Sequence, residues 1–119
     1  MTWPCRLIEK PELDENGNID LSKREVGDMW FLDVPPEELK ERHLTDQYFA
    51  QNAHRLPLVV LLPGKCYFLV DGKCFSGERG YYDGWTVTGV PPNITVSPSI
   101  NMVGAYHGFL QNGVIGDPV

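Results

Sequence analysis

The second half of the chain consists of short apolar runs separated by turn residues, and this pattern most narrows the folds open to it. Residues 58–62 (LVVLL) form a continuous apolar run of strand length, and Pro63-Gly64 follows as a turn. Residues 66–70 (CYFLV) form a second such run. Asp71-Gly72 comes next and is a strong two-residue hairpin signal before a strand over residues 73–75. We therefore expect antiparallel hairpins in this region.

The pattern continues to the C-terminus. Residues 85–88 and 94–97 alternate bulky and polar side chains, as strands with one buried face do. Residues 106–110 and 114–115 are separated by Gln111-Asn112-Gly113, whose Asn-Gly pair predicts a hairpin turn.

The clearest helix signal lies in the first half. Asp33-Val34-Pro35-Pro36 places prolines at or before a first turn, and Glu37 and Glu38 suit the positive end of the helix dipole. Thr45-Asp46 has the composition of a new N-cap. We expect two short helices, or one kinked helix, around residues 36–53.

The remaining N-terminal segments favour strands. Residues 1–8 are typical of an edge strand carrying Trp3 and Leu7, and residues 28–34 (DMWFLDV) suit either a buried strand or a surface segment packed through Trp30. The expected fold is one small α+β domain over residues 1–119, with mostly antiparallel β-sheet in the C-terminal half. The strand and helix portion, 1–55, is expected to pack on the β-rich portion, 56–119.

The net charge of the chain indicates which classes of partner it can bind. Ten Lys and Arg residues stand against sixteen Asp and Glu, a formal net charge of -6. This field repels phosphate backbones, so we expect no generic nucleic-acid binding; it suits a basic protein partner or serves solubility alone. No apolar run approaches the roughly 18 residues of a membrane span, and the first residues do not form a signal peptide. We expect a cytoplasmic protein without membrane contact or cofactor, and a homodimer remains open.

The cysteines leave a metal site as an alternative. Cys66 and Cys74 flank the expected hairpin and, with His107 and His54, offer the nitrogen and sulfur ligands that zinc favours. The chain has no Cys-x-x-Cys motif and no closely spaced histidine pair. Buried free cysteines commonly act as small hydrophobic residues, so we predict no metal.

His107 is the best candidate for chemistry. If Tyr106 and Gly108 share one strand face, His107 lies on the other. The Ser97-Pro98-Ser99 triplet lies a short hairpin away, and two hydroxyls held by a proline turn can hydrogen-bond an imidazole or a ligand.

A serine hydrolase needs more than this pair. A nucleophilic serine requires a base, an orienting acid and an oxyanion hole. The Gly-x-Ser-x-Gly pattern is absent, and nothing singles out Asp83 or Asp117 as the acid. We therefore predict no catalytic residues, and keep a small hydrolase or zinc-binding protein as the alternative.

The strongest binding signal is an aromatic loop. Tyr81, Tyr82 and Trp85 lie beside Gly77, Gly80 and Gly84, so large flat side chains stand on a permissive backbone. Such side chains give contact area at low entropic cost, which favours recognition of a partner or a planar ligand. They suit equally a lid folded over a small core.

Three segments of the C-terminal half carry a family resemblance: Trp85-Thr86-Val87-Thr88-Gly89, Ser97-Pro98-Ser99-Ile100, and residues 106–115 with Tyr106-His107-Gly108 and Gly113. In these motifs the chain resembles a family of small, uncharacterised phage and prophage proteins, sometimes labelled ammonia monooxygenase, a label that nothing in these residues supports. Some members have Cys where this chain has Tyr106. The resemblance implies a phage or mobile-element origin and a role in the cytoplasm of a bacterial host, and it implies no reaction.

These observations favour a small non-enzymatic protein that binds a host protein or sequesters a small ligand. A virion or assembly component is a further alternative. The residues expected to face the ligand or partner are Tyr81, Tyr82, Trp85, Ser97, Ser99, Tyr106 and His107.

Overall fold

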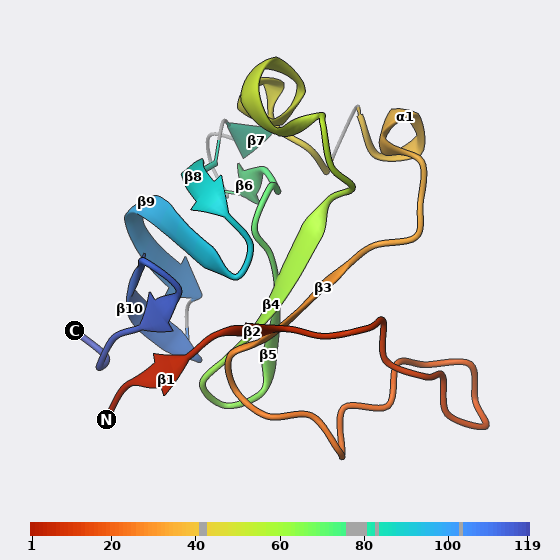
Figure 1. The fold of residues 1–119 in the computed structure, drawn as a ribbon, viewed down its shortest axis with the longest axis vertical. Helices are drawn as coiled ribbons and strands as arrows, with labels where there is room; N and C mark the ends of the chain where they lie inside the picture. Colours follow the sequence, from red (N-terminus) through yellow and green to blue (C-terminus); the bar gives the residue numbers. More distant parts are fainter. Residues whose placement is uncertain (41–42, 76–80, 83, 103) are drawn as a thin grey trace.

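The chain forms two main β-sheets that face each other, a separate two-stranded ribbon, and short helical segments at one end. The computed structural model describes residues 1–40, 43–75, 81–82, 84–102 and 104–119. Figure 1 shows β8, β9 and β10 on one side and β2, β3, β4 and β5 in the centre. The five-stranded sheet has the order β1 (Trp3–Pro4), β11 (Val114–Ile115), β10 (Tyr106–Gln111), β9 (Asn93–Met102) and β8 (Thr86–Val90). The four-stranded sheet has the order β2 (Arg6–Leu7), β3 (Asp28–Phe31), β4 (Leu58–Leu62) and β5 (Cys66–Leu69).

The main core lies between these sheets. Its buried side chains are Met29, Leu58, Val60, Leu62, Phe68 and Val70 on one side, and Val87, Ile94, Val96, Ile100, Tyr106, Leu110 and Ile115 on the other. Burying a Val, Leu, Ile or Phe side chain contributes about 1.5–3 kcal/mol each, so this layer supplies most of the driving force for folding.

The central strand β4 is buried on both faces, as its unbroken apolar run predicts. Its alternate residues Val59 and Leu61 point away from the main core and pack with Trp30 in a second cluster. Ile8, Leu21, Leu32 and Leu69 partly cover that cluster. Successive side chains of a strand point to opposite faces, so this run of five apolar residues contributes to both hydrophobic clusters.

Two of the predicted turns are confirmed. β4 and β5 pair as an antiparallel hairpin across residues 63–65, where Gly64 and Lys65 have positive φ. β10 and β11 form the predicted hairpin across Asn112-Gly113, with φ of 48° and 75°. Two successive positive φ values are what a type I′ turn requires, which explains the Asn-Gly pair.

The N-terminal edge strand is split between the sheets. β1 pairs antiparallel with β11, whereas β2 pairs parallel with β3. At Cys5 the chain passes from one sheet to the other, and the Cys5 N–H donates to Gly113 O at 2.7 Å. The predicted strand over residues 1–8 thus joins the two sheets at one edge.

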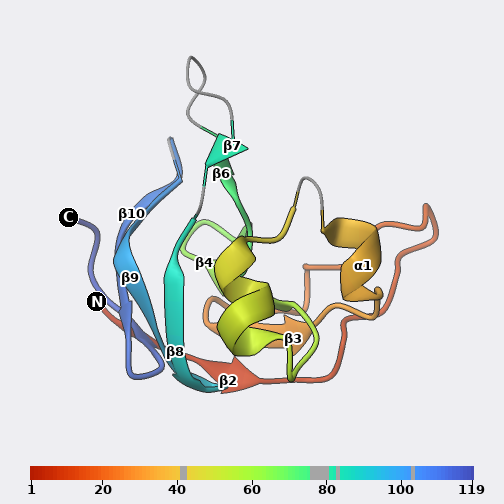
Figure 2. The same ribbon diagram turned by 90° about the horizontal axis from the view of Figure 1, so that it is seen from above.

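Two short helical segments lie in the predicted region, but they contribute little of the architecture. They are α1 (Pro36–Leu39) and the π-helical η1 (Tyr48–Asn52). Thr45 Oγ1 accepts a hydrogen bond from the Tyr48 N–H at 3.1 Å, which fits the predicted cap. The fold is therefore mostly β rather than strictly α+β. Figure 2 shows η1 beside β4 and β8 at one end of the two sheets.

The Asp71-Gly72 hairpin prediction was wrong. β5 pairs with β4, while β6 (Cys74–Phe75) pairs with β7 (Tyr81–Tyr82) in a separate two-stranded ribbon. Gly72 instead forms an isolated bridge with Leu44. Cys66 and Cys74 consequently do not flank a hairpin.

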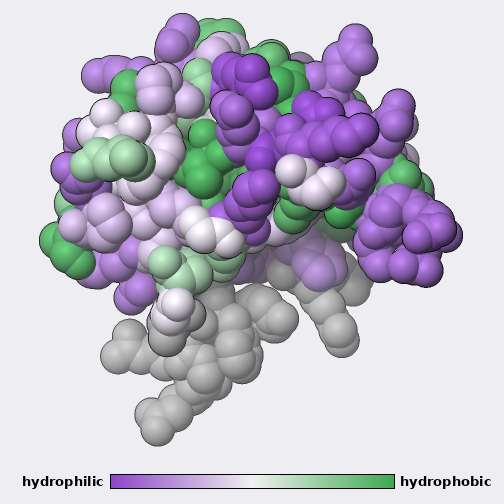
Figure 3. All heavy atoms as spheres, turned by 90° about the horizontal axis from the view of Figure 1, so that it is seen from below, coloured by the Kyte–Doolittle hydropathy of each residue, from purple (hydrophilic) through white to green (hydrophobic). Residues whose placement is uncertain are grey.

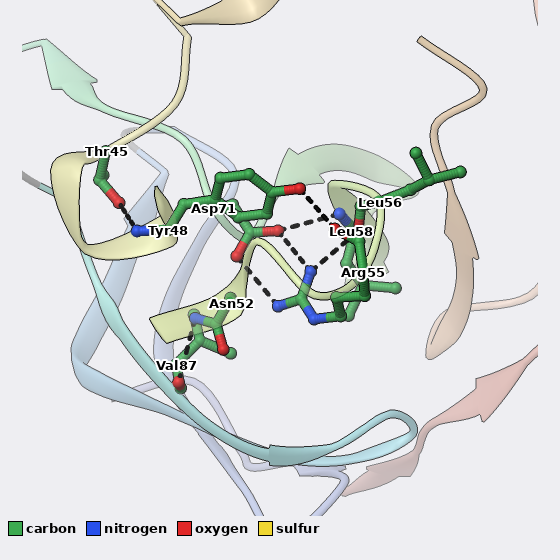
Figure 4. Close-up of polar contacts among 8 residues, drawn as sticks. All are labelled: Thr45, Tyr48, Asn52, Arg55, Leu56, Leu58, Asp71 and Val87. Carbon is green, nitrogen blue, oxygen red and sulfur yellow. Dashed lines mark hydrogen bonds and ion pairs between the residues drawn. The ribbon is translucent and has the colours of Figure 1, made fainter. Parts of the chain in front are cut away.

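Asp71 forms a buried ion pair, which Figure 4 shows. Its carboxylate, 1 % exposed, accepts two hydrogen bonds from the Arg55 guanidinium at 2.8 and 3.0 Å and one from the Leu58 N–H at 3.0 Å. The Tyr48 hydroxyl donates to the Arg55 carbonyl. A buried ion pair thus ties η1 to the start of β4 and the end of β5.

Candidate functional site

Ser99 and His107 lie together on the five-stranded sheet. They come from β9 and β10, which pair antiparallel with His107 opposite Asn101. Ser99 Oγ lies 3.4 Å from His107 Nε2. His107 is exposed and Ser99 half-buried. The predicted contact between the triplet and the imidazole is confirmed for Ser99.

The Ser-Pro-Ser triplet is not the proline turn that we expected. It lies inside β9, where Leu110 pairs with Val96 and Gly108 with Ile100. Three residues, Ser97 to Ser99, therefore stand opposite the single residue Phe109. Pro98 has no N–H to donate to a ladder, so a bulge is a place where a strand tolerates it. Ser97 belongs to the β8 side of the bulge, where it is opposite Thr86.

Tyr106 does not face the same side as His107. Burial alternates along β10, with Tyr106, Gly108 and Leu110 buried and His107, Phe109 and Gln111 exposed. The Tyr106 hydroxyl donates to Gly116 O at 2.8 Å, and burial raises the pKa of this phenol. Its ring crosses Gly108, where a Cβ would overlap the phenol oxygen. The prediction that Tyr106 faces a ligand is corrected: it is a core residue, as the strand alternation requires.

Trp85 is held at the edge of the core. Its indole Nε1–H donates to Ser99 O at 3.1 Å, and its ring meets Phe68 edge-to-face at 4.7 Å between centroids. These contacts place Trp85 under the bulge rather than on a free loop. Tyr81 and Tyr82 form β7, but their side chains, together with residues 76–80 and 83, lie outside the described residues.

The outer face of the five-stranded sheet carries a feature that the sequence analysis missed. Every Lys, Arg, Asp and Glu of the chain lies outside residues 84–116. All of β8, β9, β10 and β11 falls within this uncharged stretch. The outer face, as used below, consists of Thr86, Thr88, Thr95, Ser97, Ser99, Asn101, His107, Phe109 and Gln111.

The hydropathy of the surface shows a similar division. In Figure 3 pale colours prevail on the side of the five-stranded sheet, and deep purple, which marks hydrophilic residues, prevails on the opposite side. Phe109 is 44 % exposed among the hydroxyl, amide and imidazole groups. A signal for this surface was present in the sequence as a long stretch without formal charge.

Two side chains from the helical region border the outer face. Gln47 Oε1 accepts a hydrogen bond from the Thr86 hydroxyl at 3.2 Å, and the Asn52 amide donates to Val87 O at 3.3 Å. β8 is an edge strand, and the Asn52 amide occupies one of its outward carbonyls. This contact limits strand addition at that edge and leaves the face itself open.

The residues considered for a metal belong to different strands. Cys66 begins β5, Cys74 lies in β6 and His107 lies in β10, so three sheets hold them. Within the described part of the chain, no three His, Cys, Asp or Glu side chains are grouped to hold a metal ion. Burial, with a smaller contribution from Asp28, raises the pKa of the Cys5 thiol to about 12, so this cysteine is a poor nucleophile.

Among the described residues, no acidic side chain forms a hydrogen bond or ion pair with the His107 ring, whose side-chain partner is Ser99. Asp83 lies outside the described residues, and Asp117 forms an ion pair with the N-terminal ammonium group. The chemistry that this geometry supports best is hydrogen bonding and apolar contact by an open, uncharged face.

Comparisons with known proteins give no relative to set beside this site. A scan of protein-family models and searches of curated proteins and solved structures found no match to the chain. Among the helices that the structure describes, none has the length and apolar character to cross a membrane.

Proposed function

We propose that this is a small non-enzymatic binding protein that holds a protein partner on the outer face of its five-stranded sheet. The proposal includes the phage or mobile-element origin that the motif resemblance implies, and hence a bacterial host protein as the partner. The observation that carries it is the concentration of the net charge of -6 outside residues 84–116.

The outer face shares two features with a recognition surface, namely the lack of charged residues and an exposed aromatic side chain. The centres of protein interfaces are depleted in charged residues and enriched in aromatic ones. Ser and Asn side chains offer adaptable hydrogen bonds in binding loops, and the Thr hydroxyls of this face offer similar groups. Phe109, on β10, supplies an exposed apolar group among these polar side chains. The outer face needs no charged residues for solubility, because the charged residues on the rest of the surface already provide it.

The contact and the approach of the partner have different physical origins in this proposal. The acidic remainder of the surface attracts a basic partner over long range, and salt screens that attraction. The contact itself is uncharged, so salt should change its interaction energy little. The association rate should therefore fall as salt is raised, while the dissociation rate stays nearly constant.

Capture from a bacterial lysate tests the proposal. Wild type and the outer-face variant Phe109→Glu are immobilised, with Tyr67→Glu as the matched control on β5, where Tyr67 is 40 % exposed. Quantitative mass spectrometry should find a protein enriched by wild type and Tyr67→Glu and lost with Phe109→Glu. Identical captured sets for all three proteins would contradict the proposal.

A hydrolase remains a second candidate because Ser99 Oγ and His107 Nε2 are 3.4 Å apart. A serine activated by this histidine would react with a fluorophosphonate, and the adduct is located by peptide mass spectrometry. The binding proposal predicts no adduct at Ser99. An adduct in wild type that is lost in both Ser99→Ala and His107→Ala would favour the hydrolase.

A further inference from the structure

The four-stranded sheet ends in an open strand edge at β2. The Arg6 and Ile8 N–H groups donate inward, to Gly27 O at 3.1 Å and Met29 O at 2.7 Å. Main-chain groups alternate in direction along a strand, so the N–H and C=O of Leu7, between these two residues, point away from β3. Neither Leu7 group has a hydrogen-bond partner among the described residues. Figure 2 shows β2 at the outer border of the molecule.

An apolar groove lies along this edge. It has a volume of about 450 Å³ and is lined by Leu7, Ile8, Glu9, Lys10 and Phe31. Leu7 is 41 % exposed. Unpaired main-chain groups beside an exposed leucine form a template for another extended chain. Pro4 and Pro11 bracket the segment, and because proline has no N–H the template is short.

The charges beside this edge fit a second copy of the same chain without repulsion. Arg6 Nε donates to Asp28 Oδ1 at 2.6 Å, so the positive charge of Arg6 is already balanced. In an antiparallel pair centred on Leu7, Leu7 faces its own copy and Arg6 faces Ile8, so no like charges are opposed. A pair centred on Glu9 would oppose two carboxylates, which is unfavourable.

We propose that β2 pairs antiparallel with β2 of a second copy of this chain, about a two-fold axis at Leu7. The two Leu7 residues exchange both main-chain hydrogen bonds and their side chains fill the paired grooves. The four-stranded sheet then becomes continuous across the dimer, through a surface separate from the outer face. The contact is small, so we expect weak association, with Kd on the order of 0.1 mM.

Sedimentation velocity tests the proposal at chain concentrations from about 10 µM to about 1 mM. The average mass of wild type should rise from 13.4 kDa toward twice that value. Leu7→Lys, which opposes two cations across the axis, should stay monomeric, whereas Phe109→Lys should behave as wild type. A monomeric wild type, a dimeric Leu7→Lys or a monomeric Phe109→Lys would each contradict the proposal.

Cross-linking tests the register. In a background with all three cysteines replaced by alanine, Leu7→Cys should form a disulfide-linked dimer on mild oxidation. Cα atoms of a hydrogen-bonded antiparallel pair are about 5.5 Å apart, within the range of a disulfide. Glu9→Cys is the matched control, because its two copies would be about 13 Å apart at 3.3 Å per residue. Equal cross-linking rates for the two variants, both folded by thermal melting, would overturn the register and the proposal.

Discussion

Asp71→Ala should be the most damaging single change outside the apolar core. It leaves the Arg55 guanidinium, whose side chain is 9 % exposed, without its counter-ion, and the Leu58 N–H without its acceptor. Removing one member of a buried ion pair costs about 3–5 kcal/mol, because the other charge remains buried. A domain of this size has a free energy of unfolding of about 5–15 kcal/mol, so the loss is a large fraction of it.

Urea unfolding followed by circular dichroism measures this loss. With a slope of about 2 kcal/mol per M, the midpoint should fall by about 1.5–2.5 M. Asp33→Ala, an exposed aspartate between β3 and α1, is the control and should change the stability by less than about 0.5 kcal/mol. A loss of stability below about 1 kcal/mol for Asp71→Ala would refute the reasoning, because a buried Arg55 guanidinium without a counter-ion should destabilise the protein by more than that.

Arg55→Met and the double variant Asp71→Ala/Arg55→Met extend the same experiment. The double variant leaves neither charge buried without its partner, so its loss of stability should be smaller than the sum of the losses in the two single variants. Additive losses would show that the two side chains do not stabilise each other.

Three further predictions concern the sheets. Gly108→Ala should destabilise the protein by about 1–3 kcal/mol, since its Cβ would overlap the Tyr106 phenol; an unchanged urea midpoint would contradict this. The buried Asp28 loses solvation, which raises its pKa, but hydrogen bonds from Arg6 and the Glu25 N–H outweigh this and leave the pKa below its usual value. Its stabilising effect is therefore present above about pH 4 and lost as pH falls through the lowered pKa, so wild type should lose more stability than Asp28→Asn on acidification; parallel pH profiles would disprove this. His107→Ala lies on the outer face and should keep the free energy of unfolding, measured by urea, within about 0.5 kcal/mol of wild type, whereas loss of folding would make His107 a structural residue.

The strands were predictable wherever local periodicity decides burial. Residues 58–62 and 106–110 became β4 and β10 with nearly the predicted bounds, because an unbroken apolar run and a strict alternation each have one simple solution in a two-sheet fold. The Asn112-Gly113 turn was predictable for a similar reason, since an Asn-Gly pair itself favours the two positive φ values of this turn.

The predictions were wrong where contacts with residues far away in the sequence determine the local structure. Asp71-Gly72 does lie at a turn, where the Gly72 N–H donates to Leu69 O, but β5 pairs with β4 and not with β6. The Asp71 carboxylate instead pairs with Arg55, sixteen residues earlier. The bulge at Pro98 depends on how β9 pairs with β10, which no window around the Ser-Pro-Ser triplet contains. Tyr106 was assigned to the ligand-facing set although the alternation that exposes His107 also turns Tyr106 inward.

The candidate surface was present in the sequence in another form. A stretch without Lys, Arg, Asp or Glu over residues 84–116 marks the strands whose outer side chains form the uncharged face. Net charge alone concealed it, because a total of -6 says nothing about where the charges lie.

The affinity of the purified captured partner for matched variants tests the central proposal most directly. Titration calorimetry should show that Phe109→Glu weakens binding by about 10-fold or more, as expected for an aromatic residue at the centre of a contact. Tyr67→Glu, on the other sheet, should bind within about 2-fold of wild type, as expected for a residue outside the contact. Equal affinities for wild type and Phe109→Glu would contradict the assignment of the outer face as the binding surface.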